Sequence, residues 1–434
     1  MKYTFLYILA GVVLATMAIA QSTTAEPDKI MRLQEQLDNG AAKLEFDSQG
    51  YVKSLLKALD IPVSSQGLVF SKTSVQRDMI TPGTPRAVFF NDDIYLAYLR
   101  GAQFIEIVTT DPQKRLAFYL LEQQNEKPPK FERQTSMCQV CHDPHYTGPA
   151  QLLMTSHFTD KEGNPLQSSN PEQTRQLSFN ITDHSPMNER FGGWYVTGTH
   201  GDQLTMGNLV SSLASRDIGT NPLGYAKTLN LARGANLTDL SKLFDTTWYP
   251  SRHSDIVALM TLIHQVNAQN YIIRAVTELE NALRTDEKIG IHSPTPSPAR
   301  MGKVQDAVEQ LVRVLLFADE AQLKSPIKGT SGFAEEFAER GPKDRQGRSL
   351  RQFDLQRRLF RYPLSYMIYS QAFDQMPDLL KQYTYSRLAE ILTGKDTSGA
   401  YGNLAQADRQ AILEILDETK PEFKSTVLGT ASEF

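Results

Sequence analysis

The sequence lacks any long hydrophobic run after its first 20 residues. A transmembrane helix needs about 18 or more consecutive apolar residues, so we expect no stable membrane span in the remainder of the chain. The first 20 residues differ, because Lys2 precedes an apolar run that closes on Ala18-Ile19-Ala20. A basic start, a short apolar run and small residues at the cut are typical of a secretory signal peptide. We predict a signal peptide over residues 1–20, cleaved after Ala20.

The alternative for this segment is an uncleaved membrane anchor. Its apolar run is shorter than the ~20 residues that a membrane span requires, which favours cleavage. No cysteine lies near the predicted cut, so a lipoprotein is not expected. The mature chain is therefore expected in the periplasm or an equivalent exported space.

The sequence also lacks an excess of either charge. It has 45 basic and 49 acidic residues, a formal net charge of −4, and no long run of one sign. Nucleic-acid binding therefore has no electrostatic support. With 40% hydrophobic and 22% charged residues, the composition is that of a globular protein with a sizeable core. No internal repeat indicates a solenoid or an array.

Three regions with different patterns succeed one another along the chain. Residues 21–135 carry short helical patterns followed by β-branched and aromatic stretches, which predict antiparallel strands at 87–90, 94–98, 104–108 and 116–121. Residues 136–250 are rich in Gly, Thr, Asn, Asp and Pro, which is typical of long ordered loops. The regions together predict an α+β fold: an N-terminal strand-rich unit, a central loop-rich segment and a C-terminal mainly helical unit.

Residues 251–434 are expected to be mainly helical. Ser254 is the expected N-cap of the first long helix, and residues 324–348 are the expected linker within this unit. The apolar periodicity predicts helices at 255–284, 304–323, 350–369, 378–392 and 404–418.

The only two cysteines stand three residues apart in Cys138-Gln139-Val140-Cys141-His142. This spacing is that of a c-type haem attachment site. Two thiols can form thioether bonds to the two haem vinyl groups, and a histidine beside the second thiol can reach the iron. The sequence therefore predicts one covalently attached haem c on Cys138 and Cys141, with His142 as the proximal iron ligand.

Three other readings of the same cysteines remain open. A thioredoxin-like dithiol would require a strand-to-helix context, which the loop-rich flanks do not favour. A structural zinc site would require four ligands and would add a residue such as His145. A local disulfide is the third alternative. The predicted export favours haem, since the machinery that attaches haem works outside the cytoplasm, where thiols do not stay free.

The second axial ligand is not determined by the motif. His200 and Met206 lie in the loop-rich region, where a loop can reach a cofactor. His264 stands eleven residues after His253, which places both on nearly the same face of one helix, and Met260 stands one turn before His264. We expect the distal ligand among His200, His264, Met206 and Met260, with the two histidines ranked first.

The second axial position decides the expected function. A haem with both axial positions filled transfers electrons, whereas an open distal side can bind and activate small molecules. The leading expectation is an exported mono-haem cytochrome that exchanges electrons with periplasmic redox partner proteins. The alternatives are a peroxidase-like haem oxidoreductase, with Arg190 near His184 as a possible distal pair, and a haem-based redox or gas sensor.

Several long stretches resemble one family: large exported bacterial proteins that contain a cytochrome c domain and have no established reaction. The resemblance spans most of the mature chain. It implies haem c binding by Cys138, Cys141 and His142 and a role in electron transfer. It also implies that the haem segment is embedded between the strand region and the helical region. The resembling stretches are 70–74, 85–93, 138–142, 192–201, 253–260 and 362–366.

Overall fold

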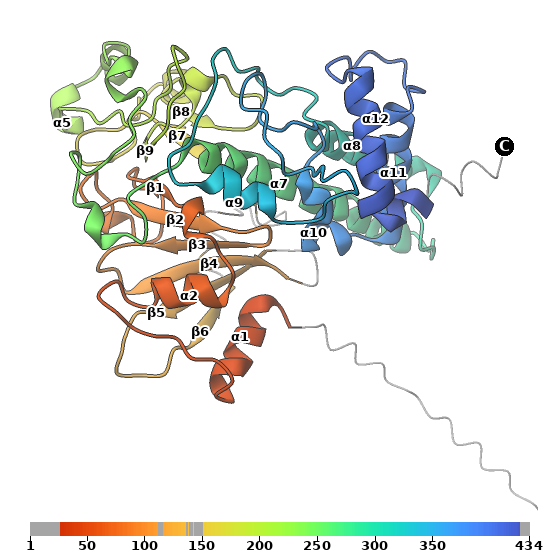
Figure 1. The fold of residues 1–434 in the computed structure, drawn as a ribbon, viewed down its shortest axis with the longest axis horizontal. Coiled ribbons are helices and arrows are strands. Elements are labelled where there is room, and N and C mark those ends of the chain that lie inside the picture. The colour runs from red at the N-terminus through yellow and green to blue at the C-terminus, as the bar shows by residue number, and fades with distance from the viewer. Residues whose placement is uncertain (1–26, 112–115, 136–137, 139–141, 143–150, 426–434) are drawn as a thin grey trace, which may run out of the picture.

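The computed structural model describes residues 27–111, 116–135, 138, 142 and 151–425 (Figure 1). The predicted signal peptide, residues 1–20, lies outside the described residues. The chain has the α+β fold that its sequence predicts. An antiparallel sheet forms from the N-terminal region, and the helices are concentrated in the C-terminal half.

Seven antiparallel strands form the main sheet, in the order β6-β5-β4-β3-β2-β1-β9. The four strands expected from sequence are confirmed as β2 to β5. The last strand in the order, β9, comes from the loop-rich central region and pairs with β1. The strands are β1 (Gly67–Val69), β2 (Arg86–Phe90), β3 (Ile94–Tyr98), β4 (Phe104–Thr110), β5 (Leu116–Glu122), β6 (Phe131–Gln134) and β9 (Trp194–Tyr195). A separate hairpin joins β7 (Thr155–His157) to β8 (Ser178–Asn180).

The two faces of the main sheet are covered by different helices. On one face, Phe89, Ile105 and Leu121 pack into a core with α1 (Lys29–Asp38) and α2 (Val52–Ala58). Side chains of the opposite face, such as Phe90 and Phe118, belong to a second core with the long helix α7 (Ile256–Glu287). Because successive side chains of a strand point to opposite faces, alternate residues of each strand serve the two cores.

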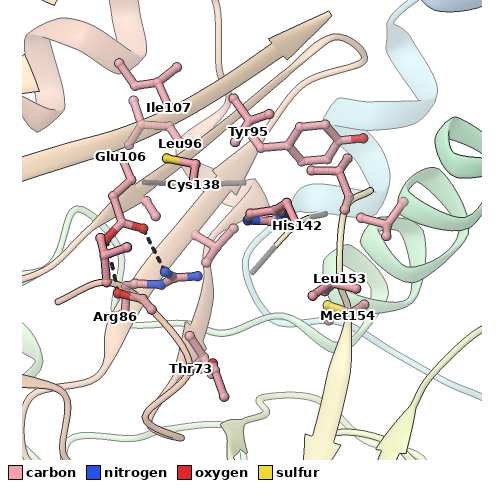
Figure 2. A pocket seen from close by; sticks show the side chains of 18 of the residues that line it. Thr73, Arg86, Tyr95, Leu96, Glu106, Ile107, Cys138, His142, Leu153 and Met154 are labelled. Atoms are coloured by element: carbon pink, nitrogen blue, oxygen red, sulfur yellow. Dashed lines mark hydrogen bonds and ion pairs between the residues drawn. The ribbon is translucent and has the colours of Figure 1, made fainter. Parts of the chain in front are cut away.

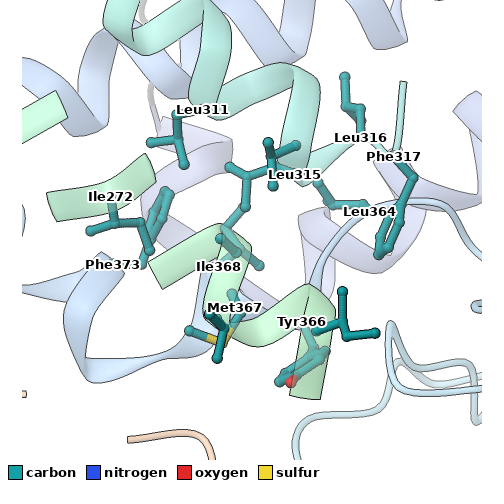
Figure 3. Close-up of a cluster of buried hydrophobic side chains, with 14 of the residues drawn as sticks. Ile272, Leu311, Leu315, Leu316, Phe317, Leu364, Tyr366, Met367, Ile368 and Phe373 are labelled. Atoms are coloured by element: carbon teal, nitrogen blue, oxygen red, sulfur yellow. The ribbon is translucent and has the colours of Figure 1, made fainter. Parts of the chain in front are cut away.

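The C-terminal half is built around α7. Residues 256–269 of this helix are buried on every side, as expected for a helix at the centre of a core. Figure 3 shows how Ile272 of α7, Leu311 and Leu315 of the next helix, and Phe373 of a later one form a buried apolar cluster. The remaining helices are α4 (Pro171–Arg175), α5 (Ser215–Ile218), α6 (Pro222–Ala226), α8 (Pro298–Leu315), α9 (Phe333–Glu339), α10 (Gln371–Asp374), α11 (Asp378–Leu392) and α12 (Gln406–Thr419).

Two polar side chains hold the N-terminus of α7, and one of them bonds it to the sheet. The expected cap, Ser254, does not cap the helix. Its hydroxyl donates to the carbonyl of Tyr195 (2.6 Å) and accepts from the amide of Leu68 (2.9 Å), so it bridges β9 and β1. Asp255 is the N-cap instead, and its Oδ1 accepts from the amide of Val257 at 2.8 Å. The helix therefore begins one residue later than the sequence pattern predicts, because the hydroxyl of Ser254 is bonded to the strands.

Two further sequence expectations in the C-terminal region are wrong. Residues 350–369 do not form a helix, apart from a short 3-10 turn at Tyr366–Tyr369. The Oδ1 of Asp354 accepts from the amides of Gln356 and Arg357 (2.9 and 2.8 Å), and such side-chain bonds compete with helical ones. The expected linker at 324–348 contains α9, whose Phe333 and Phe337 are buried in the core with α7.

Among the described residues, no helix combines the length and the apolar character that crossing a membrane requires.

The buried carboxylate of Asp255 yields a stability prediction. Its Oδ2 accepts from the amides of Thr330 and Ser331 (2.6 and 2.8 Å), in addition to the capping bond of Oδ1. Asp255→Ala would leave several buried amides without an acceptor, each costing about 1–3 kcal/mol. We expect it to lower the free energy of unfolding by about 3 kcal/mol or more, measured by denaturant titration followed by circular dichroism.

Asp245→Ala is the matched control, since Asp245 is an exposed cap that bonds the amide and the hydroxyl of Thr247. Its loss should cost about 1 kcal/mol. Equal effects of the two substitutions would contradict the role given to Asp255.

Candidate haem site

A largely apolar cavity of about 470 Å³ lies between the main sheet and α7. Its volume is in the range of natural ligand pockets. Cys138 and His142 of the predicted haem motif both line it (Figure 2). The sheet contributes Val88, Ala97, Val108, Phe118 and Leu120, α7 contributes Leu262 and Val266, and the segment around β7 contributes Leu152, Leu153, Met154, Thr155 and His157.

A backbone hydrogen bond joins the two described residues of the motif. The amide of His142 donates to the carbonyl of Cys138 at 3.1 Å, four residues earlier. This bond places the imidazole and the first thiol beside the same cavity. Cys141, the second predicted attachment residue, lies outside the described residues, as does His145 of the zinc alternative.

The His142 ring is oriented by the chain segment that follows the motif. Its Nδ1 donates to the carbonyl of Gln151 at 2.6 Å, while the amide of Gln151 donates to the carbonyl of His142 at 2.9 Å. The ring also packs against Phe118, with 4.8 Å between centroids. A proton held on Nδ1 leaves the lone pair on Nε2, the form in which histidine binds a metal. Burial lowers the pKa of His142, which further favours the neutral ligand form.

The segment after the motif is fixed to α7 by a side-chain amide. Asn270 accepts from the amide of Leu152 (2.9 Å) and donates to its carbonyl (2.8 Å). The indole of Trp194, in β9, donates to the carbonyl of Thr155 at 2.9 Å. These bonds hold Leu153 and Met154 along the cavity wall, although Leu153 is 50% exposed. A half-exposed leucine at the mouth of an apolar cavity leaves apolar surface for a ligand to cover.

A single ion pair interrupts the apolar lining. Arg86 of β2 donates through Nη1 to Oε2 of Glu106 in β4 at 2.8 Å. Ala97 of the intervening strand pairs with Glu106, and its small side chain lets the ion pair span β3. Both charged side chains are mostly buried and line the cavity with Cys138 and His142.

His200 does not line the cavity. It is buried in the loop region, where its Nδ1 donates to the carbonyl of Gln203 (2.7 Å) and its Nε2 accepts from the amide of Asn236 (3.2 Å). Both ring nitrogens are therefore used to hold loops together. This arrangement does not favour His200 as an iron ligand.

His264 is likewise placed away from the cavity, at the centre of the helical core. Its Nδ1 is bonded to Oδ2 of Asp183 (3.0 Å), its Nε2 is bonded to the hydroxyl of Ser365 (2.7 Å), and its ring stacks on Phe317 at 4.1 Å. Its position on α7 faces the C-terminal segment, whereas Leu262 and Val266 of the same helix face the cavity. Sequence periodicity could not separate these faces because this part of α7 is buried all round.

The two methionines expected near the iron are also buried elsewhere. Met206 accepts a bond from the hydroxyl of Ser156, at 3.7 Å from its sulfur, and neither Met206 nor Met260 is part of the cavity lining. The structure therefore brings Cys138 and His142 together and leaves all four expected distal residues apart from them.

Two residues of the cavity lining, Met154 and His157, have side chains that can bind iron. The sequence analysis did not predict either of them as a ligand. Their one signal was their closeness in sequence to the motif. Both imidazole nitrogens of His157 are bonded, to the hydroxyls of Ser178 (2.9 Å) and Thr155 (2.8 Å). Met154 is buried and belongs to the core that includes α7. An apolar cavity, an oriented imidazole and a thiol on one wall fit a haem c.

The burial of His157 yields a pH prediction. Burial lowers the pKa of His157 from 6.5 to about 4. The unfolded chain binds this proton near pH 6.5 and the folded chain only near pH 4, so folding stability falls as the pH drops through this window. We expect His157→Gln to lose less stability between pH 7 and pH 4.5 than the wild type, by at most about 3 kcal/mol. Denaturant titrations at the two pH values measure this difference, and parallel losses would contradict it.

No protein-family model, curated protein or solved structure matches this chain. The candidate site is therefore defined by its own contacts: an apolar cavity whose wall carries Cys138, the oriented ring of His142, and the side chain of Met154.

Proposed function

We propose that this chain is an exported c-type cytochrome that carries one haem and transfers electrons to or from periplasmic redox partner proteins. The haem would be attached through Cys138 and Cys141, with His142 as its proximal ligand. The observation that carries the proposal is the orientation of His142. Its Nδ1 is bonded to the Gln151 carbonyl, and its ring lies in the wall of a largely apolar cavity of about 470 Å³.

A bound haem c would supply one-electron chemistry at its iron. The chain would supply the environment that makes this exchange selective. The carbonyl of Gln151 fixes the tautomer of His142 and increases its basicity as a ligand. The apolar side chains of the sheet and of α7 would exclude water from the haem. Electrostatic interactions between the haem and nearby charges are stronger in a site without water.

Met154 is the proposed second axial ligand. It replaces the four residues expected from sequence because it lines the same cavity as His142. His157 is less suited, since both its ring nitrogens already have hydroxyl partners. A haem held between a histidine and a methionine has both axial positions filled, which favours electron transfer over the activation of small molecules.

The peroxidase-like alternative would require a distal base next to an arginine. Arg190, the sequence-based candidate, donates to the carbonyls of Ser185 and Asp183 (both 2.8 Å) and is buried outside the cavity lining. His184, its expected companion, is exposed. This geometry favours the electron carrier.

The covalent attachment is tested first. Protein made together with haem-ligation machinery should stain for haem on a denaturing gel, because thioether bonds survive denaturation. Cys138→Ala combined with Cys141→Ala should abolish the stain. Wild-type protein made without the machinery is the control. A stain that persists in the double variant would overturn the proposed attachment.

Axial ligation gives a second test. The ferric wild type should show a low-spin optical and EPR spectrum, and Met154→Ala should convert it to a high-spin form by opening one axial position. Met206→Ala and Met260→Ala are matched controls that should keep the low-spin spectrum. His200→Ala and His264→Ala should keep it as well. An unchanged spectrum in Met154→Ala would contradict the ligand assignment.

A further inference from the structure

The connection between α7 and α8 is an exposed loop that carries two large apolar side chains. The two helices pack against each other, so this loop closes a helical hairpin. Residues 287–295 are exposed without interruption. Ile289 is 63% exposed, more than any other large apolar residue that the structure describes, and Ile291 is 40% exposed. Single exposed apolar residues are common, but two so close together make residues 289–291, the hairpin tip, a local apolar surface.

The backbone turn at the hairpin tip explains why Ile291 stays exposed. Gly290 has a φ of +82°, its amide donates to the carbonyl of Glu287 (3.0 Å), and the amide of Ile291 donates to the carbonyl of Asp286 (3.0 Å). These bonds form a Schellman motif, in which the residue after the glycine usually packs on an apolar residue of the last helical turn. The corresponding positions here are Thr285 and Asp286, which are polar. Ile291 therefore finds no apolar side chain at these positions.

The base of the loop is closed by a buried carboxylate. Asp286 is 2% exposed and accepts from the amide (2.6 Å) and the hydroxyl (2.8 Å) of Ser297 and from Nε of Arg300 (2.8 Å). Three prolines between residues 294 and 298 further restrict the backbone. A loop that is already ordered loses little conformational entropy when it binds. The loop thus presents its two isoleucines without rearrangement.

The charge around the hairpin tip is opposite in sign to that of the whole chain. Residues 284–303 contain four basic and two acidic residues, a net charge of +2, whereas the chain has a net charge of −4. The ion pair of Arg300 with Asp286 neutralises one charge of each sign. Arg284, Lys288 and Lys303 remain against a single acid, Glu287. The surroundings of the isoleucines therefore attract an anionic surface.

We propose that the hairpin tip inserts into the surface of a membrane that contains anionic lipids. Ile289 and Ile291 enter the boundary between headgroups and acyl chains, and the neighbouring basic side chains contact the lipid phosphates. Binding of this kind scales with the apolar area buried and with the attraction to anionic lipids. A lipid surface needs no pocket shaped to fit the two side chains, which favours it over a protein partner. The contact is peripheral, requires no membrane span and does not depend on the haem.

The experiment is flotation of the purified exported protein with vesicles of phosphatidylethanolamine and phosphatidylglycerol. The wild type should float with the vesicles. Ile289→Asp combined with Ile291→Asp should lower the partition coefficient at least about tenfold, because the variant loses the apolar area that the membrane buries. Both residues are exposed, so the variant should keep the circular dichroism spectrum of the wild type. Leu243→Asp is the matched control, since Leu243 is 46% exposed in another loop, and it should float like the wild type.

A lysine substitution tests the charge requirement. Lys288→Gln should lower binding to the anionic vesicles about fivefold and leave any binding to phosphatidylcholine vesicles unchanged. Lys227→Gln is its control, because Lys227 is an exposed lysine that follows α6, in the loop-rich region. Equal effects of Lys288→Gln on the two kinds of vesicle would overturn the assignment of anionic lipid.

Two other outcomes would overturn the membrane proposal. The first is no flotation of the wild type, or equal flotation of the wild type and the double isoleucine variant. The second is a wild type that does not float but forms dimers in analytical ultracentrifugation, with the double variant monomeric, which would make the hairpin tip a contact between two copies of the chain. Neither outcome affects the haem stain, so failure of this inference is distinguishable from failure of the proposed function.

Discussion

The buried N-terminus of α7 is the junction on which the rest of the structure depends. Here a fully buried carboxylate, Asp255, accepts from amides of its own helix and of the loop at 330–331. Beside it, Ser254 bonds β1 and β9. A buried charge is tolerated only when it is thoroughly hydrogen-bonded, so these partners must assemble together. A side chain at Gly329 would be 2.5 Å from the same carboxylate, which leaves glycine as the residue that fits.

The packing of α7 against the sheet sets the positions of the cavity walls. Leu262 and Val266 come to face Val108 and Phe118 across it. One turn beyond Val266, Asn270 binds both backbone groups of Leu152 and so holds the segment that returns from the haem motif. That segment presents the Gln151 carbonyl to His142. The orientation of the His142 ring therefore depends on a helix more than a hundred residues away in sequence.

The sequence predicts regular elements well where one local pattern dominates. The strands β2 to β5 and the helices α7 and α11 are found near their expected residues, because apolar periodicity agrees there with the burial that the fold imposes. The expected helix at 350–369 fails because Asp354 bonds nearby amides and so favours a turn. The expected cap Ser254 fails because strands distant in sequence engage its hydroxyl.

The residues of the candidate site were likewise predictable from the sequence only in part. The proposed attachment and proximal residues, Cys138, Cys141 and His142, rest on the sequence because they lie within five consecutive residues with the spacing of a haem c motif. The distal side was not open to prediction, because a buried histidine of the core, such as His264, has the same sequence pattern as a ligand. Only the tertiary structure placed Met154 and Arg86 in the cavity of His142. Their positions follow from strand register and from the docking of α7, which depend on contacts between residues far apart in the chain.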